Sequence, residues 1–179
     1  RPQWYTVTNR SRTYVQKIIT KLSGEYFKNN PVKKIISRNS GVDLYYGGES
    51  EFFNYDKVIL ATHADEALSI IENPSDDEKK VLSNFSYKEN FAYIHTEEKI
   101  MPKNKNAWCS WNSLMKRNDI EKNSITYWLN LLQNLNIEKN IFLTLNPYHE
   151  ISEKQIYKKV YFTHPSYDHD ALKSQKELD

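Results

Sequence analysis

In the first third of the chain, the spacing of apolar residues predicts one helix followed by a small β-sheet. Ser11 is a candidate N-cap for a helix whose apolar residues recur at helical spacing, and Gly24 is its stop signal. Residues 32–46 predict a β-hairpin with its turn at residues 39–41 (NSG), because apolar residues alternate on both sides of that turn. Residues 52–53 (FF) then begin a return strand.

The middle of the chain holds its most continuous apolar run. Residues 57–61 (KVILA) are β-branched or apolar at nearly every position, which is typical of a strand buried on both faces. Residues 62–65 (THAD) end that strand, and residues 66–71 predict a helix. Residues 75–78 (SDDE) form a capping-box signature and predict the start of a further helix.

The second half contains short strand patterns and one closing helix. We predict strands at residues 91–96, 141–145 and 160–162, a loop at 101–106, a short aromatic strand or bend at 107–111 and a helix at 170–178. Residues 125–132 (ITYWLNLL) fit a helix or a strand equally well. Strands and helices therefore do not alternate regularly, and the predicted fold class is α+β, with a mixed or antiparallel sheet and flanking helices.

Composition narrows the functional classes. The 179 residues carry a net charge of only +2, with acids and bases interleaved, which does not favour a nucleic-acid binder. No apolar run is long enough to span a membrane. Cys109 is the one cysteine, so a disulfide within the chain is impossible and a cytoplasmic location is expected. We expect Cys109 itself to be a buried structural residue.

The sequence gives little sign of a metal site, a phosphate-binding loop or a serine nucleophile. His164, Asp168, His169 and Asp170 are potential metal ligands, but their spacing after a proline is more typical of a polar loop, so no metal is expected. The chain has neither a phosphate-binding P-loop nor a nucleophile elbow built on serine. No catalytic residue is identified.

An ordered set of short motifs resembles a known family. The motifs are residues 1–7 (RPQWYTV), 56–67 (DKVILATHADEA), 93–96 (YIHT), 101–102 (MP), 107–112 (AWCSWN), 126–133 (TYWLNLLQ), 145–147 (LNP) and 164–165 (HP). Together they resemble the predicted NAD/FAD-binding, amine-oxidase-like flavoproteins of bacteria, in the flavin-containing amine oxidase superfamily. The resemblance implies that residues 1–65 abut the FAD domain and that residues 66–179 form a substrate-binding α+β domain.

Departures from that family are equally informative. The chain lacks the glycine fingerprint G-x-G-x-x-G that binds the pyrophosphate, and it lacks the family's carboxy-terminal glycine-rich flavin segment. Thr8, Asn9 and Arg10 stand where relatives often carry a glycine pair. The expected reading is an internal, substrate-side piece of a longer protein. Its partners would be the missing FAD-binding segments of the same parent chain, and alone it would not hold FAD tightly.

The resemblance also implies where a cofactor would lie. Residues 61–64, which are Ala61, Thr62, His63 and Ala64, correspond to a turn next to FAD, and Val32 corresponds to a position whose backbone meets the adenine. For His63 the alternative is a role in capping the following helix. No residue is assigned to the chemical step, because the flavin itself accepts the hydride.

Four aromatic residues are candidates for a substrate wall: Trp108, Trp111, Tyr127 and Trp128. The alternative is that they are ordinary core aromatics, and strand alternation cannot place Trp108 and Trp111 on one face. The parent is thus expected to be an FAD-dependent oxidoreductase that acts on an apolar, lipid-like substrate or an amine. The rival hypothesis is a stand-alone binding module without cofactor chemistry.

Overall fold

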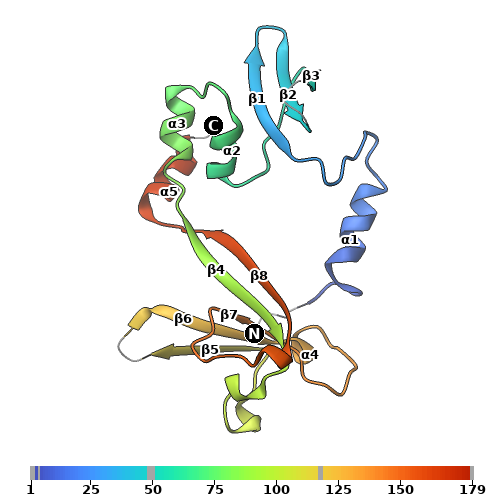
Figure 1. The fold of residues 1–179 in the computed structure, drawn as a ribbon, viewed down its shortest axis with the longest axis vertical. Helices are drawn as coiled ribbons and strands as arrows, with labels where there is room; N and C mark the ends of the chain where they lie inside the picture. The colour runs from blue at the N-terminus through green and yellow to red at the C-terminus, as the bar shows by residue number, and fades with distance from the viewer. Residues whose placement is uncertain (1–2, 4, 48–50, 117–118, 178–179) are drawn as a thin grey trace. The chain divides into compact units, whose positions relative to one another are not determined.

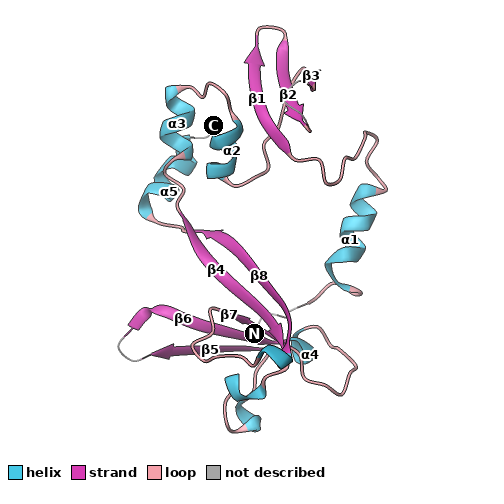
Figure 2. Cartoon of the chain, viewed as in Figure 1, coloured by secondary structure: helices cyan, strands magenta, loops and turns pink. Residues whose placement is uncertain are grey.

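The computed structural model describes residues 3, 5–47, 51–116 and 119–177 of the chain. It divides into two compact units. We call Arg1–Ser23 with Glu89–Thr163 the sheet unit, and Gly24–Lys88 with His164–Asp179 the hairpin unit. Each contains an antiparallel sheet, and helices lie apart from the strands along the chain, which confirms the predicted α+β class (Figures 1 and 2).

The hairpin unit begins with a three-stranded antiparallel sheet. Its strands are β1 (Val32–Arg38), β2 (Gly41–Tyr46) and β3 (Phe52–Tyr55), in that order. The predicted hairpin is confirmed, since Arg38 pairs with Gly41 across the turn. Glycine is needed at position 41, because its φ is +128° and an added Cβ would lie 2.5 Å from the carbonyl oxygen of Tyr55.

Three helices complete the hairpin unit: α2 (Ala64–Ile70), α3 (Asp76–Leu82) and α5 (His169–Ser174), the last continued by the 3-10 turn η4 (Gln175–Glu177). The predicted capping box is confirmed at α3, where the Glu78 backbone N–H donates to Ser75 Oγ at 3.1 Å. In return the Ser75 N–H donates to the Glu78 carboxylate at 2.7 Å. Asp168 caps α5 through the Ala171 N–H.

One prediction in the hairpin unit is wrong. Residues 57–61 form an extended segment outside any strand, although a strand buried on both faces was expected. Ile59 is 92% exposed, and no strand pairs with this segment in the part of the chain that the structure describes. A strand buried on both faces needs hydrogen-bonded neighbours and two covering layers. The described residues supply neither.

The sheet unit contains a five-stranded antiparallel sheet of order β5-β6-β7-β4-β8. Its strands are β5 (Trp111–Lys116), β6 (Asp119–Trp128), β7 (Phe142–Leu145), β4 (Tyr87–His95) and β8 (Ile156–Pro165). Short helical turns join them: η1 (Glu98–Ile100), η2 (Lys105–Ala107), α4 (Leu129–Leu132) and η3 (Glu153–Gln155). The strands predicted at 91–96, 141–145 and 160–162 are confirmed. The ambiguous segment 125–132 contains both a strand and a helix, because β6 ends at Trp128 and α4 follows directly.

The N-terminal helix α1 (Arg10–Ile19) belongs to the sheet unit. Its N-cap is Asn9, so the predicted cap at Ser11 is wrong by two residues. Asn9 and Arg10, at the start of the helix, both adopt a positive φ, of 61° and 67°. Of the motif at residues 1–7, Arg1, Pro2 and Trp4 lie outside the described residues.

Candidate functional site

The strand register of the five-stranded sheet separates its side chains into two faces of different character. One face, which we call the apolar face, carries Ala92, Ile94, Trp111, Met115, Ile125, Tyr127, Leu143 and Leu145, together with the polar residues Ser113 and Asn123. The opposite face, which we call the covered face, carries Tyr93, His95, Asn112, Leu114, Ser124, Thr126, Trp128, Phe142 and Thr144; its β5 edge is open, since Leu114 is 42% exposed. This division follows from the alternation of side chains along each strand.

The apolar face is open over much of its width. Trp111 and Met115 on β5 are each 61% exposed, and Tyr127 on the neighbouring strand is half-buried. The rings of Trp111 and Tyr127 contact each other with centroids 5.6 Å apart. Ile125, Leu143 and other members of the face are also only half-buried. A row of large apolar side chains without a complete cover is typical of a surface that binds a partner or a ligand.

The covered face instead hides a chain of polar side chains. His95 on β4, Thr144 on β7 and Thr126 on β6 are buried on three neighbouring strands. His95 Nε2 lies 2.7 Å from Thr144 Oγ1, which lies 2.9 Å from Thr126 Oγ1. The Glu97 backbone N–H donates to His95 Nδ1 at 3.1 Å. Nδ1 is therefore the acceptor and Nε2 carries the hydrogen, so His95 donates to Thr144 Oγ1, which shares a second hydrogen bond with the Thr126 hydroxyl.

This hydrogen-bonded chain requires a neutral imidazole. Burial lowers the pKa of His95 to about 4, and the nearby Glu97 carboxylate only partly opposes that effect. A proton on Nδ1 would also meet the Glu97 N–H that already donates there. The three side chains thus form a buried network in which each polar group has a partner, the condition under which polar groups are tolerated in a core.

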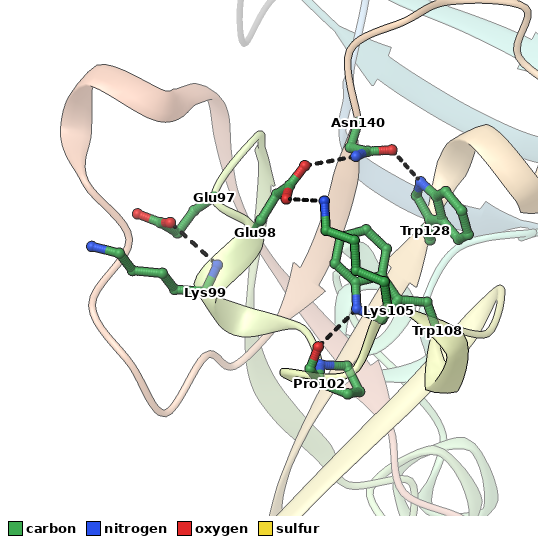
Figure 3. Close-up of polar contacts among 8 residues, drawn as sticks. All are labelled: Glu97, Glu98, Lys99, Pro102, Lys105, Trp108, Trp128 and Asn140. Atoms are coloured by element: carbon green, nitrogen blue, oxygen red, sulfur yellow. Dashed lines mark hydrogen bonds and ion pairs between the residues drawn. The ribbon is translucent and has the colours of Figure 1, made fainter.

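Two tryptophans cover this face at its β6–β7 end. The Trp108 ring packs edge-on against Trp128 and Phe142, with centroids 5.3 Å and 5.7 Å away. The indole N–H of Trp108 donates to the Pro102 carbonyl at 2.8 Å, and that of Trp128 donates to Asn140 Oδ1 at 3.0 Å (Figure 3). Both polar tips are therefore bonded inside the protein, as expected of structural tryptophans.

A polar cluster, which we call the brace and which consists of Glu98, Lys105 and Asn140, holds these two rings in place. The Asn140 amide donates to one Glu98 carboxylate oxygen at 2.7 Å, and Lys105 Nζ lies 3.0 Å from the other (Figure 3). Both contacts lower the pKa of Glu98, and the hydrogen bond from Asn140 has the larger effect. Lys105 also lies over the Trp108 ring, 5.2 Å from its centroid. Sequence reasoning missed this brace, since its members are scattered through polar loops.

The four aromatics predicted for a substrate wall do not form one wall. Trp108 and Trp128 lie on the covered side and fit the core alternative. Trp111 and Tyr127 lie together on the apolar face. The sequence argument that strand alternation separates Trp108 from Trp111 does not apply, because Trp108 follows η2 and lies before β5 begins at Trp111. A substrate role remains a prediction for Trp111 and Tyr127.

The predicted flavin turn, residues 61–64, lies in the hairpin unit. Ala61 and Thr62 are exposed, and His63 occupies the N-cap position of α2 without a capping hydrogen bond from its side chain. The His63 ring stacks on Tyr87, with centroids 4.5 Å apart, and the Ala64 N–H donates to Tyr87 Oη at 2.6 Å. Tyr87 therefore fixes the turn, a role that no motif in the sequence indicates.

The chemistry of this turn fits only part of an FAD molecule. The small, exposed residues Ala61 and Thr62 permit close approach of a flat ring or a sugar. The pyrophosphate does not fit, because the Ala64 N–H is already bonded and Asp65 and Glu66 place negative charge in the first turn of α2. Val32, the other predicted cofactor contact, is a half-buried residue at the start of β1.

Two further sequence candidates have structural explanations. Cys109 is exposed, so the expected burial of this cysteine is wrong; it lies in the loop between η2 and β5, where its thiol donates to the Ala107 carbonyl. Asp168 serves as the N-cap of α5 and accepts a hydrogen bond from Ser86 at 3.1 Å. Across the described ranges, His, Cys, Asp and Glu side chains form no group of three placed to hold a metal ion.

A hollow of about 880 Å³ lies elsewhere in the sheet unit. Residues 6–11, which lead into α1, form one side, and residues 132–137, which follow α4, form the other. Separately, no helix among the described residues has the length and apolar character needed to cross a bilayer.

Comparisons with known proteins give a likeness of structure and none of sequence. No family model matches the chain, and no curated protein matches its sequence. The fold is similar to the crystal structure of a CLA-producing fatty acid isomerase from P. acnes, with a TM-score of 0.58 and 12% sequence identity. The match covers 93% of this chain but only 43% of the isomerase chain. At this identity the likeness concerns the fold.

Proposed function

We propose that this chain is the substrate-side part of an FAD-dependent oxidoreductase, and that its apolar face contacts an apolar, acyl-type substrate. The observation that carries the proposal is that the five-stranded sheet buries the polar side chains of His95, Thr126 and Thr144 on one face and leaves Trp111 and Met115 exposed on the other. Burying apolar surface stabilises a complex by roughly 25 cal/mol per Å². The face therefore offers binding free energy to an acyl chain.

The likeness to a fatty acid isomerase supports an acyl substrate over an amine, because that neighbour acts on a fatty acid. The apolar face itself points the same way. Among the described residues, its side chains are aliphatic or aromatic apart from Met115, Ser113 and Asn123, and none is a carboxylate that could hold an ammonium group. Trp111 and Tyr127 are the residues that we assign to substrate contact.

For the cofactor, we propose that Val32 and residues 61–64 contact the uncharged portions of FAD. A bound flavin would accept a hydride from the substrate, while the protein supplies orientation and a dry surface. The pyrophosphate must be held by other segments of the parent protein, since the acidic first turn of α2 opposes it. The exposed residues Ile59 and Leu60 are a natural contact for those segments, because Ile59 is almost wholly exposed.

An absorbance spectrum of the full-length parent tests the cofactor assignment. The protein is purified with FAD and then desalted, beside an Ala61→Trp variant and a matched Ala107→Trp control at the exposed end of η2 in the other unit. We expect flavin bands in the parent and the control, and their loss in Ala61→Trp because the large ring blocks the turn. A parent that retains no flavin contradicts the oxidoreductase function.

The second candidate is a binding module without cofactor chemistry. It is favoured by Tyr87, which already uses the Ala64 N–H of the turn. The same spectrum separates the two functions. If the parent lacks flavin but still binds an acyl ligand in a Trp111-dependent manner, the binding module is the correct description.

A further inference from the structure

The hollow beside α1 has a chemistry that the apolar face lacks. It is built within the sheet unit from residues 6–11 and 132–137, which are far apart in sequence. Its volume of about 880 Å³ lies in the range of small-molecule sites.

One wall of the hollow is fixed by a single side chain. Asn130 accepts from the Ile141 N–H at 2.8 Å, and its amide donates to the carbonyls of Ile137 at 3.3 Å and Lys139 at 2.9 Å. The backbone carbonyl of Asn130 accepts from the Leu135 N–H at 2.9 Å. The loop that carries Leu135 and Ile137 is thereby held in shape without a ligand, which lowers the entropy cost of binding.

The facing wall has an unusual backbone. Asn9 and Arg10 both have a positive φ, although neither is glycine. The turn is held by the Arg10 N–H, which donates to the Val7 carbonyl at 2.9 Å, and by Thr13 Oγ1, which donates to the Asn9 carbonyl at 3.1 Å. Two consecutive residues of this kind store conformational strain of a sort that often marks ligand sites.

The side chains of the hollow combine one positive charge with apolar surface. Arg10 is the charged residue of the lining, which includes no acid. Arg10 also has no ion-pair partner among the residues that the structure describes. Val7, Leu132, Leu135 and Ile137 provide apolar contacts, and the remaining lining residues carry hydroxyl or amide groups.

We propose that this hollow binds a long-chain carboxylate, with the carboxylate on Arg10 and the start of the acyl chain against Leu135 and Ile137. A guanidinium matches a carboxylate in charge and geometry. A protonated amine finds no counter-charge in the lining. The inference rests on the proposed function only because it treats this ligand as the substrate. Among the apolar, acyl-type substrates of the proposed function, it selects the long-chain carboxylates.

Calorimetric titration of the full-length protein with sodium dodecanoate, below its micelle concentration, tests the site. We expect saturable binding that weakens at least about tenfold in Arg10→Gln, because a charge-assisted hydrogen bond is lost. Arg12→Gln is the matched control, since Arg12 lies on α1 but outside the lining. Leu135→Ser should also weaken binding, whereas Leu131→Ser should not, because Leu131 is 55% exposed and outside the lining.

Several outcomes overturn the proposal: no binding of dodecanoate, equal losses in Arg10→Gln and Arg12→Gln, or dodecylamine binding as tightly as dodecanoate. The flavin spectrum of the same preparations separates this result from the proposed function. Flavin retained without Arg10-dependent binding rejects the carboxylate site and leaves the oxidoreductase standing. Arg10-dependent binding without flavin supports the site and rejects the oxidoreductase.

Discussion

The two faces of the five-stranded sheet differ in a direction opposite to the usual one. The covered face buries a histidine, a serine and two threonines, whereas the apolar face leaves Trp111 and Met115 largely exposed. Polar groups are acceptable in the interior when all of them are hydrogen-bonded, and His95, Thr126 and Thr144 bond one another. The comparison teaches that one face is built for stability and the other is left available for binding.

The largest expected difference between the faces comes from their aromatic residues. Phe142 is fully buried on the covered face, so Phe142→Ala should lower the free energy of unfolding by about 3–5 kcal/mol. Trp111→Ala on the apolar face should change it by no more than about 0.5 kcal/mol, since the side chain is 61% exposed. Urea unfolding measures both. Similar losses in the two variants would contradict the assignment of roles.

The next effect is a pH dependence confined to the covered face. The pKa of His95 is lowered to about 4 from 6.5, so the folded state binds this proton less readily than the unfolded state. The stability that this provides is complete above pH 6.5 and is lost as the pH falls toward 4, by about 3 kcal/mol in total.

Urea unfolding between pH 7 and pH 4.5 measures that loss. In His95→Gln the slope over this window should flatten, because glutamine does not titrate. The pKa values of Asp43 and Glu98 are also lowered, so these two groups change the stability only at the acid end of this pH range and below it. An unchanged slope in the variant would show that His95 is not the group that titrates.

A smaller effect is expected from breaking the hydrogen-bonded chain at its centre. Thr144→Val removes the acceptor of His95 Nε2–H and the hydrogen-bond partner of Thr126 Oγ1, at a cost of about 1–3 kcal/mol. Ser113→Val, on the exposed apolar side of β5, is the control and should be nearly neutral. A double-mutant cycle with Thr126→Val then measures the coupling, and additive effects would argue against a connected chain.

Local signals in the sequence predicted much of the fold. The capping box at Ser75, the hairpin turn before Gly41 and the end of β7 at Leu145, just before Asn146, all depend on residues close together in the chain. Such features are decided by short-range hydrogen bonds and backbone preferences, which any sequence window contains. The failure at residues 57–61 has the opposite cause, because a buried strand depends on neighbours that the window does not contain.

The candidate sites follow the same division. By itself the sequence determined the α+β class and the aromatic candidates. Only the tertiary structure decided that Trp111 joins Tyr127 on the open face and that Arg10 lies opposite Leu135 across a hollow. Strand register brings Trp111 to Tyr127, and loop closure brings Arg10 to Leu135, which lies far along the chain. The interactions that choose them are long-range packing and hydrogen bonds, which leave no local pattern in the chain.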